Sequence, residues 1–148
     1  MGFTMTRSMR IGTAILTALL RAGLPLGPLA LLSVVGRRSG RRYTVPVALL
    51  ERNGTRWLVA AFGEVNWVRN VRAAGEARLG RGRRMETVRA VELGPAEAAP
   101  VLKRYLEKYR KVPFIAPYFE ATAKSPLAEL AREASRHPVF RVVRTSGT

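Results

Sequence analysis

Asn53 and Gly54 stand between two apolar runs, YTVPVALLE and RWLVAAF, and this feature most constrains the fold. An Asn-Gly pair in such a place favours a two-residue β-turn, because both residues tolerate positive φ. The sequence therefore predicts a β-hairpin with strands over Tyr43 to Glu51 and Arg56 to Phe62. Pro46 cannot donate a ladder hydrogen bond, so we expect its amide side to face an edge, a bulge or a ligand.

The rest of the chain predicts further strands and a few helices. Strands are expected over Leu29 to Val35, Ala77 to Leu79, Met85 to Leu93 and the closing HPVFRVV segment. Helices are expected over Thr6 to Ala22, Val65 to Ala74, from Pro95 to a stop at Pro113 and Pro117, and over Leu127 to Ser135. This order predicts an α+β fold built on a small, partly open β-barrel. At 148 residues we expect a single domain, with a helix and connection in 1–28 and the barrel in 29–148.

The N-terminal helix allows three interpretations. Ile11, Ile15 and Leu19 recur on one helical stripe, with Arg10 and Arg21 near its ends. The stripe is typical of a core-packing or dimer helix, and also of an amphipathic helix on an acidic membrane surface. A cleaved signal or an anchor is the third interpretation, although the apolar block is shorter than the roughly 20 residues that span a bilayer.

Composition excludes several kinds of site. The chain has no cysteine and one histidine, His137, which excludes disulfides, thiolate metal sites and multi-histidine metal sites; we therefore expect no bound metal. No pair of carboxylates and no serine-histidine-acid set is recognisable, so the sequence offers no catalytic residues for a hydrolase. His137 precedes Pro138 and is expected to be a turn or core histidine rather than a proton donor.

The charge is strongly positive: 26 Lys and Arg against 10 Asp and Glu leave a net charge of +16. Such a field attracts nucleic acid, acidic lipid or a phosphorylated ligand. A nucleic-acid-binding domain would place aromatic side chains among the arginines, and the cluster at 37–42 has only Tyr43 beside it. We therefore expect no nucleic-acid partner, and a basic nucleic-acid-binding domain is kept as an alternative.

Three motifs together resemble the deazaflavin-dependent nitroreductase family. They are GRRSGRRYTVPV (36–47), the hairpin end VAAFG (59–63) and NWVRNVRAAG (66–75), with HPVFRV resembling the closing strand of that family. The resemblance implies a split β-barrel of the FMN-binding-like kind that uses coenzyme F-420, a deazaflavin with a phosphate and a poly-glutamate tail. It implies a reductase that transfers a hydride from the reduced cofactor to a quinone, a nitro-aromatic or an activated alkene.

The resemblance also implies where the cofactor binds. Ser39 and Gly40 would turn backbone amides toward the phosphate, with arginines around them. The residues expected at the cofactor are Arg37, Arg38, Ser39, Gly40, Arg42, Tyr43, Thr44, Val45, Pro46, Val47, Ala60, Ala61, Phe62, Gly63, Asn66, Trp67 and Asn70. Backbone of Ala60 to Phe62 would hold the ring, and Tyr109, Phe114 and Tyr118 are candidates for the acceptor side. Tyr105 and Tyr109 are four positions apart, which is also the spacing of packing residues on one face of a helix. No catalytic residue is assigned.

Two departures from the family pattern affect these expectations. Only Glu64 and Val65 separate Gly63 from Asn66, where similar proteins have a longer loop, and Tyr43 stands where many have an arginine. An FMN-dependent reductase of the same fold and a non-catalytic cofactor carrier are the alternatives. We expect a cytoplasmic protein with a small-molecule acceptor; a homodimer is implied by the resemblance, and peripheral membrane contact through the first helix is left open.

Overall fold

The turn at Asn53 and Gly54 joins two antiparallel strands, β2 (Arg42–Arg52) and β3 (Thr55–Val59). In the computed structural model, which describes residues 6–24, 28–109 and 119–145, both turn residues have positive φ, 51° and 81°. This is the turn geometry that matches the twist of paired strands. The predicted hairpin is confirmed, although β3 ends three residues earlier than expected, at Val59.

Six antiparallel strands close into a barrel in the order β1-β2-β3-β6-β5-β4. The other strands are β1 (Leu29–Val35), β4 (Glu76–Arg81), β5 (Arg84–Glu92) and β6 (Val139–Arg144). The α+β barrel class is confirmed, but the barrel is closed rather than partly open. Closure comes from a short ladder in which Leu31 to Ser33 of β1 pair with Arg78 to Gly80 of β4.

The first half of β2 has a strand neighbour on one side only. Pro46 lies opposite Leu31 of β1, whereas the pairing of β2 with β3 begins only at Leu49. Among the described residues, no strand pairs with the other side of Pro46. Its position agrees with the expected edge, because a proline has no N–H to offer a second strand.

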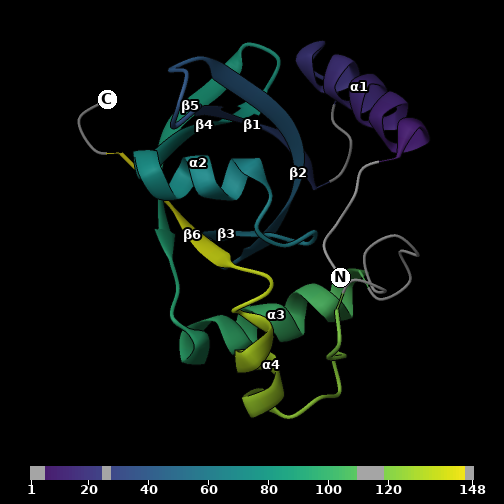
Figure 1. Ribbon diagram of the computed structural model, residues 1–148, viewed down its shortest axis with the longest axis vertical. Helices are drawn as coiled ribbons and strands as arrows, with labels where there is room; N and C mark the ends of the chain where they lie inside the picture. Colours follow the sequence, from purple (N-terminus) through teal and green to yellow (C-terminus); the bar gives the residue numbers. More distant parts are fainter. Residues whose placement is uncertain (1–5, 25–27, 110–118, 146–148) are drawn as a thin grey trace.

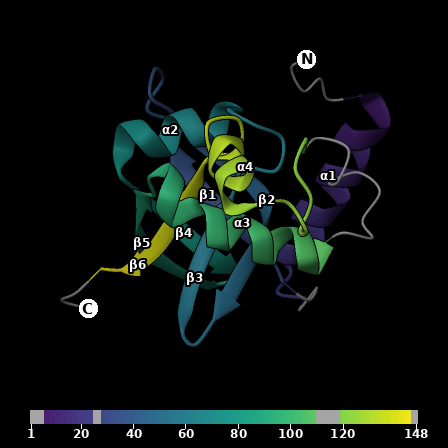
Figure 2. The ribbon, with the colours of Figure 1, turned by 90° about the horizontal axis from the view of Figure 1, so that it is seen from below.

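Helices in the described part of the chain cover the barrel at two places (Figure 1). Helix α2 (Asn66–Ala74) adds Val68 and Val71 to the barrel core, beside Leu32 and Leu58. Helix α3 (Pro95–Tyr109) packs against β3 and β6, and α4 (Leu127–Glu133) packs on α3 (Figure 2). The two helices and these strands form a second apolar cluster. The predicted ends at Pro113 and Pro117 lie outside the described residues.

Helix α1 (Arg7–Arg21) lies at one corner of the barrel, against β1 and β2 (Figure 1). The apolar stripe predicted from the sequence faces away from the barrel. Ile11, Ile15 and Leu19 are 54, 56 and 37% exposed, and Leu20 is the fully buried residue of the helix. The interpretation that this stripe packs into the core of its own chain is therefore wrong. None of the described helices combines the length and apolarity needed to cross a bilayer.

Candidate functional site

A cavity of about 370 Å³ lies where β1 ends, β2 begins and α2 starts. This volume is within the range of small-molecule sites. Eight of the residues expected at the cofactor line it, together with Val34 and Gly36: Arg37, Arg38, Ser39, Tyr43, Val45, Asn66, Trp67 and Asn70. The structure therefore brings the first and third sequence motifs together, although 33 positions separate Arg37 from Asn70.

The turn between β1 and β2 is closed by its own backbone. The Gly36 amide donates to the Arg41 carbonyl at 2.6 Å, and the Gly40 amide donates to the Gly36 carbonyl at 3.0 Å. Gly40 has φ of +74°, which only glycine adopts at little cost. Within the described chain, the backbone amides of Arg38 and Ser39 donate to no protein group, so this turn presents two N–H groups to an incoming acceptor.

The two neighbouring arginines of the turn have different surroundings. Asn70 is 4% exposed on α2, and its Oδ1 accepts from the Arg37 amide at 3.1 Å and from the Arg37 guanidinium at 2.7 Å. This pair of bonds ties the turn to α2. Arg38 is exposed and has no hydrogen-bond or ion-pair partner among the residues that the structure describes. Of the two arginines that line the cavity, Arg38 is therefore the one that can bind an anion without first breaking an internal bond.

Arg42 does not line the cavity, contrary to the expectation that it completes the arginine clamp. Its guanidinium donates to the Ser33 carbonyl at 3.2 Å and to the Ser33 hydroxyl at 3.3 Å. Successive residues of a strand point to opposite faces, so Tyr43 and Val45 reach the cavity. The expected residues on β2 and its turn that are absent from the lining are Gly40, Arg42, Thr44, Pro46 and Val47.

Apolar side chains form the opposite wall. Val34, Val45 and Trp67 line the cavity, and the Trp67 ring also packs against Phe140 with centroids 6.0 Å apart. Trp67 is thus both a core residue and a wall residue. A cavity with a cationic, amide-rich end and an apolar wall suits an elongated ligand that has an anionic group and a flat ring.

Tyr43 lies over the turn, with its hydroxyl 3.2 Å from Ser39 Oγ. A Cβ at Gly36 would stand 2.5 Å from Cε2 of this ring, so glycine is required for the ring to lie there. Gly36 and Val34 are cavity residues that sequence reasoning did not single out. The glycine was visible as the first residue of the GRRSG motif, but its contact with Tyr43 was not.

The segment 60–63 does not line the cavity, and its backbone is largely committed. The amides of Ala60, Ala61 and Gly63 donate to Pro138, Val59 and Ala60 carbonyls at 2.9, 2.9 and 3.1 Å. Of the amides expected to hold a ring, those of Ala60 and Ala61 are therefore engaged within the protein. The segment instead connects β3 to the first turn of α2, where Asn66 and Trp67 reach the cavity.

Of the acceptor-side candidates, only Tyr109 lies in the described chain; Phe114 and Tyr118 lie outside the described residues. Tyr109 is buried in the α3–α4 cluster, its ring 4.7 Å from that of Tyr105, and its hydroxyl donates to the Leu49 carbonyl at 3.4 Å. Burial raises the pKa of both tyrosines above the ordinary value of 10. Their helical spacing thus reflects packing.

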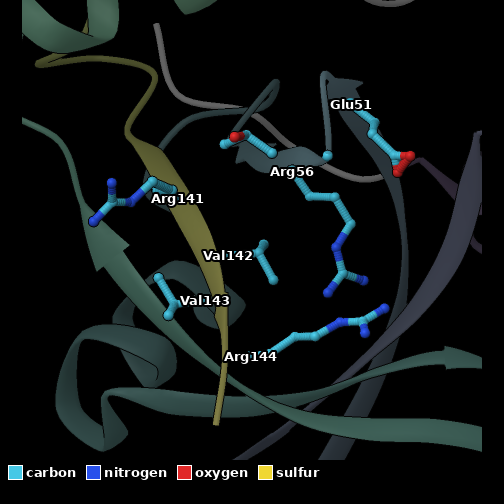
Figure 3. A pocket seen from close by; sticks show the side chains of 8 residues that line it. Glu51, Arg56, Arg141, Val142, Val143 and Arg144 are labelled. Carbon is cyan, nitrogen blue, oxygen red and sulfur yellow. The ribbon is translucent and has the colours of Figure 1, made fainter. Parts of the chain in front are cut away.

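A second hollow of about 620 Å³ lies at the other end of β2 (Figure 3). The side chains of Arg56, Val142 and Arg144 point into it, whereas Arg141 points away. Arg56 and Arg144 both pair with Glu86, so their charges are partly neutralised. No residue expected at the cofactor lines this hollow, and the described chain contains no cluster of residues that could hold a metal ion.

Comparison with known proteins agrees with the fold and the motifs. A family model described as F420H(2)-dependent quinone reductase matches residues 9–116. A similar solved structure, described as a domain-swapped dimer, has 26% identity and a TM-score of 0.57, covering 87% of this chain and 91% of that one. The structure of an F420-H2 dependent reductase has 24% identity and a TM-score of 0.54, covering 78% and 93%.

More distant structures share the fold alone. A FAD-binding protein from Mesorhizobium loti has 12% identity and a TM-score of 0.51, with 90% of this chain and 91% of that one covered. No curated protein matches the sequence.

Proposed function

The chain belongs to the F420H(2)-dependent quinone reductase family, and from that premise we propose that the cavity beside Arg38 binds the phosphate of reduced coenzyme F420. Membership makes the chain an F420-dependent reductase. The observation that carries the proposed site is that the two arginines differ in their hydrogen bonds. Asn70 accepts from Arg37, whereas Arg38 and two backbone amides are left for a ligand.

The residues of the cavity fit the chemistry of this cofactor. Arg38 offers a forked set of donors, and the amides of Arg38 and Ser39 add fixed N–H groups, so a phosphate would receive charge-assisted hydrogen bonds. The first turn of α2 carries Asn66 and Trp67 into the cavity, and the start of a helix favours negative charge. The exposed position of Arg38 leaves room for acidic groups beyond the phosphate.

The apolar wall has a different part in the proposal. Bound F420H2 supplies a hydride, which the protein must direct to an acceptor and shield from water. Trp67 and Val45 offer flat and apolar contact to a ring, and Trp67 is held in place by Phe140. We assign to these side chains the orientation of the ring, and to Arg38 and the turn the binding of the phosphate.

A quinone is the acceptor that we propose first, because the family is defined by quinone reduction. A nitro-aromatic or an activated alkene is the alternative. The test is anaerobic oxidation of F420H2, followed by absorbance, with a soluble menaquinone analogue, a nitro-aromatic compound or an enone as acceptor. Faster turnover of the quinone is expected, whereas preference for either other class would overturn the proposed acceptor.

The cofactor is tested separately by binding. Titration of the protein with F420 should quench the deazaflavin fluorescence saturably, and FMN serves as the control ligand. Saturable binding of FMN without binding of F420 would refute the proposed site and favour the flavin-dependent alternative.

We also infer that α1 contacts an anionic membrane surface. Its exposed stripe of Ile11, Ile15 and Leu19 is unpartnered in the described structure. The Gly82 amide donates to the Leu20 carbonyl at 2.8 Å, which sets the helix end against the β4–β5 turn. Arginines therefore lie near both ends of the helix that carries the stripe, and each near a bilayer contributes about 1 kcal/mol. They are Arg7, Arg10, Arg21, Arg83 and Arg84.

Vesicle sedimentation tests this contact. Binding is expected to vesicles rich in phosphatidylglycerol, less to neutral phosphatidylcholine, and to be lost in Ile15→Asp. Leu127→Asp on α4 is the matched control, since Leu127 is 55% exposed and distant in sequence. If Ile15→Asp instead converts a dimer to a monomer, as light scattering would detect, the stripe is a contact between two copies; a similar structure is a domain-swapped dimer.

A further inference from the structure

The ladder between β3 and β6 ends at a proline, and a histidine side chain takes the place of the missing amide. Val59 pairs with Val139, so Ala60 lies opposite Pro138. The Ala60 amide donates to the Pro138 carbonyl at 2.9 Å. A strand residue at 138 would return a hydrogen bond to the Ala60 carbonyl, but proline has no N–H. His137 Nδ1 lies 2.9 Å from that carbonyl oxygen instead.

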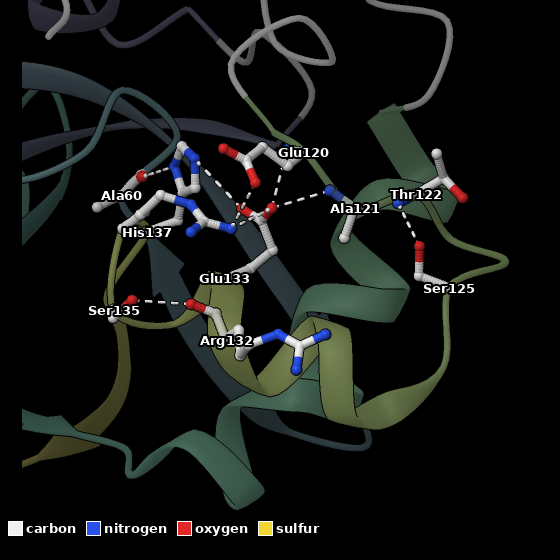
Figure 4. A network of polar contacts seen from close by, with 10 residues as sticks. Ala60, Glu120, Ala121, Thr122, Ser125, Arg132, Glu133, Ser135 and His137 are labelled. Carbon is white, nitrogen blue, oxygen red and sulfur yellow. Dashed lines mark hydrogen bonds and ion pairs between the residues drawn. The ribbon is translucent and has the colours of Figure 1, made fainter. Parts of the chain in front are cut away.

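The imidazole of His137 is fixed in one orientation (Figure 4). A carbonyl oxygen only accepts, so Nδ1 must carry the hydrogen. The side chain of His137 is 5% exposed, and the ring stacks on Phe119 with centroids 3.8 Å apart and an angle of 16°. Its Nε2 lies 3.6 Å from Oε2 of Glu133, which is the last residue of α4 and is fully buried.

Glu133 is held in turn by other groups. Its Oε1 accepts from the amides of Glu120 and Ala121, both at 2.8 Å, and from the Arg136 guanidinium at 3.0 Å. The carboxylate therefore joins the end of α4, the irregular segment at 119–121 and the approach to β6. His137 connects this assembly to the backbone of Ala60.

Ala60 begins the connection that leads to the cavity. The same connection contains Gly63, where a Cβ would stand 3.3 Å from the Arg136 carbonyl, so the segment packs closely against the residues before His137. Asn66 and Trp67 follow in the first turn of α2 and line the cavity. The path from residue 60 to these two cavity residues is therefore short and closely packed.

We propose that His137 is a positioning residue: by donating to the Ala60 carbonyl it fixes the 60–65 connection and, through it, the wall of the cavity formed by Asn66 and Trp67. This role rests on the proposed cofactor site. Nothing in it requires His137 to touch the cofactor or to transfer a proton.

Two variants separate the hydrogen bond from the packing of the ring. His137→Phe keeps an aromatic ring against Phe119 but removes the donor. His137→Asn loses the ring but keeps an amide N–H near the position of Nδ1. Leaving a buried carbonyl without its donor is costly, so His137→Phe should weaken F420 binding about tenfold, whereas His137→Asn should stay within about threefold of wild type.

Hydrogen exchange of the unliganded protein gives a readout that does not depend on the cofactor. Exchange in a peptide covering 60–67 should rise in His137→Phe and not in His137→Asn, while a peptide covering β4 and β5 stays unchanged. If His137→Phe fails to fold, His137→Gln is the second variant lacking the donor, because its amide reaches the position of Nε2 rather than Nδ1.

The outcomes are distinct. Wild-type affinity and exchange in His137→Phe would overturn the positioning role, and so would equal losses in the Phe and Asn variants, which would indicate packing alone. Failure of the wild-type protein to bind F420 would instead refute the proposed cofactor site, and the exchange measurement would still decide whether His137 fixes the connection.

Discussion

Replacing Arg38 by alanine should weaken F420 binding far more than removing an arginine elsewhere. Arg38 is exposed and has no partner in the described chain. The backbone amides of Arg38 and Ser39 beside it donate to no protein group there. A hydrogen bond to a charged group contributes about 1.5–3 kcal/mol, and the exposure of the site favours the lower part of that range. Since about 1.4 kcal/mol corresponds to a factor of ten, the dissociation constant should rise roughly ten- to thirtyfold.

Arg52→Ala is the matched control for this experiment. Arg52 is exposed at the far end of the same strand, β2, whose 11 residues measure about 35 Å along the strand. Charges separated by more than the Debye length of about 8 Å at physiological ionic strength are largely screened, so Arg52 should contribute little to the site. Arg136 is unsuitable as a control, because its guanidinium pairs with Glu120 and Glu133.

Equilibrium titration of deazaflavin fluorescence in each variant, at low and at physiological ionic strength, decides the matter. The reasoning predicts a large loss for Arg38→Ala that persists in salt and at most about a twofold change for Arg52→Ala. Equal losses in the two variants would refute it, since the net charge of +16 rather than a local clamp would then account for binding.

Three further changes test the site and the core. Asn70→Ala removes the acceptor of both Arg37 bonds, so it should lower the free energy of unfolding by about 1–3 kcal/mol in urea titration and weaken F420 binding; an unchanged stability would contradict the role of this link. Gly36→Ala should displace the Tyr43 ring and weaken F420 binding without unfolding the protein, as circular dichroism would verify. The pKa of Tyr105 is raised in the folded protein, so the unfolded state loses the phenolic proton first as the pH rises. The contribution of Tyr105 to stability is therefore full below about pH 10 and falls above it. Tyr105→Phe should lessen this alkaline loss of stability in thermal unfolding, and a pH profile identical to that of the wild type would exclude the effect.

Sequence reasoning succeeded where a structure depends on neighbours in the chain. Asn53 and Gly54 specify their turn through their own backbone preferences, and the apolar runs on either side became strands near the expected bounds. The GRRSG turn was likewise recognisable from its glycine and its basic residues. Such features need no knowledge of distant residues, because local conformational preference already selects them.

Choices among equivalent side chains were decided only by the tertiary structure. Arg37, Arg38 and Arg42 look alike in the sequence, yet Asn70 engages the first, Ser33 engages the third, and the second is left without a partner in the described chain. The periodic pattern in α1 did not predict whether its apolar stripe faces the barrel or the surface, because such a stripe can pack into a core or bind a partner equally well.

The same limit explains the 60–63 segment and His137. The sequence determined the barrel, its hairpins and the motif that marks the cavity, because these follow from turn chemistry and alternation along each strand. It could not determine that Pro138 leaves a carbonyl without its amide, or that His137, 77 positions from Ala60, supplies the missing donor. Hydrogen bonds between distant parts of the chain exist only after the strands have paired, so the tertiary structure alone decides which polar groups are engaged and which can bind a ligand.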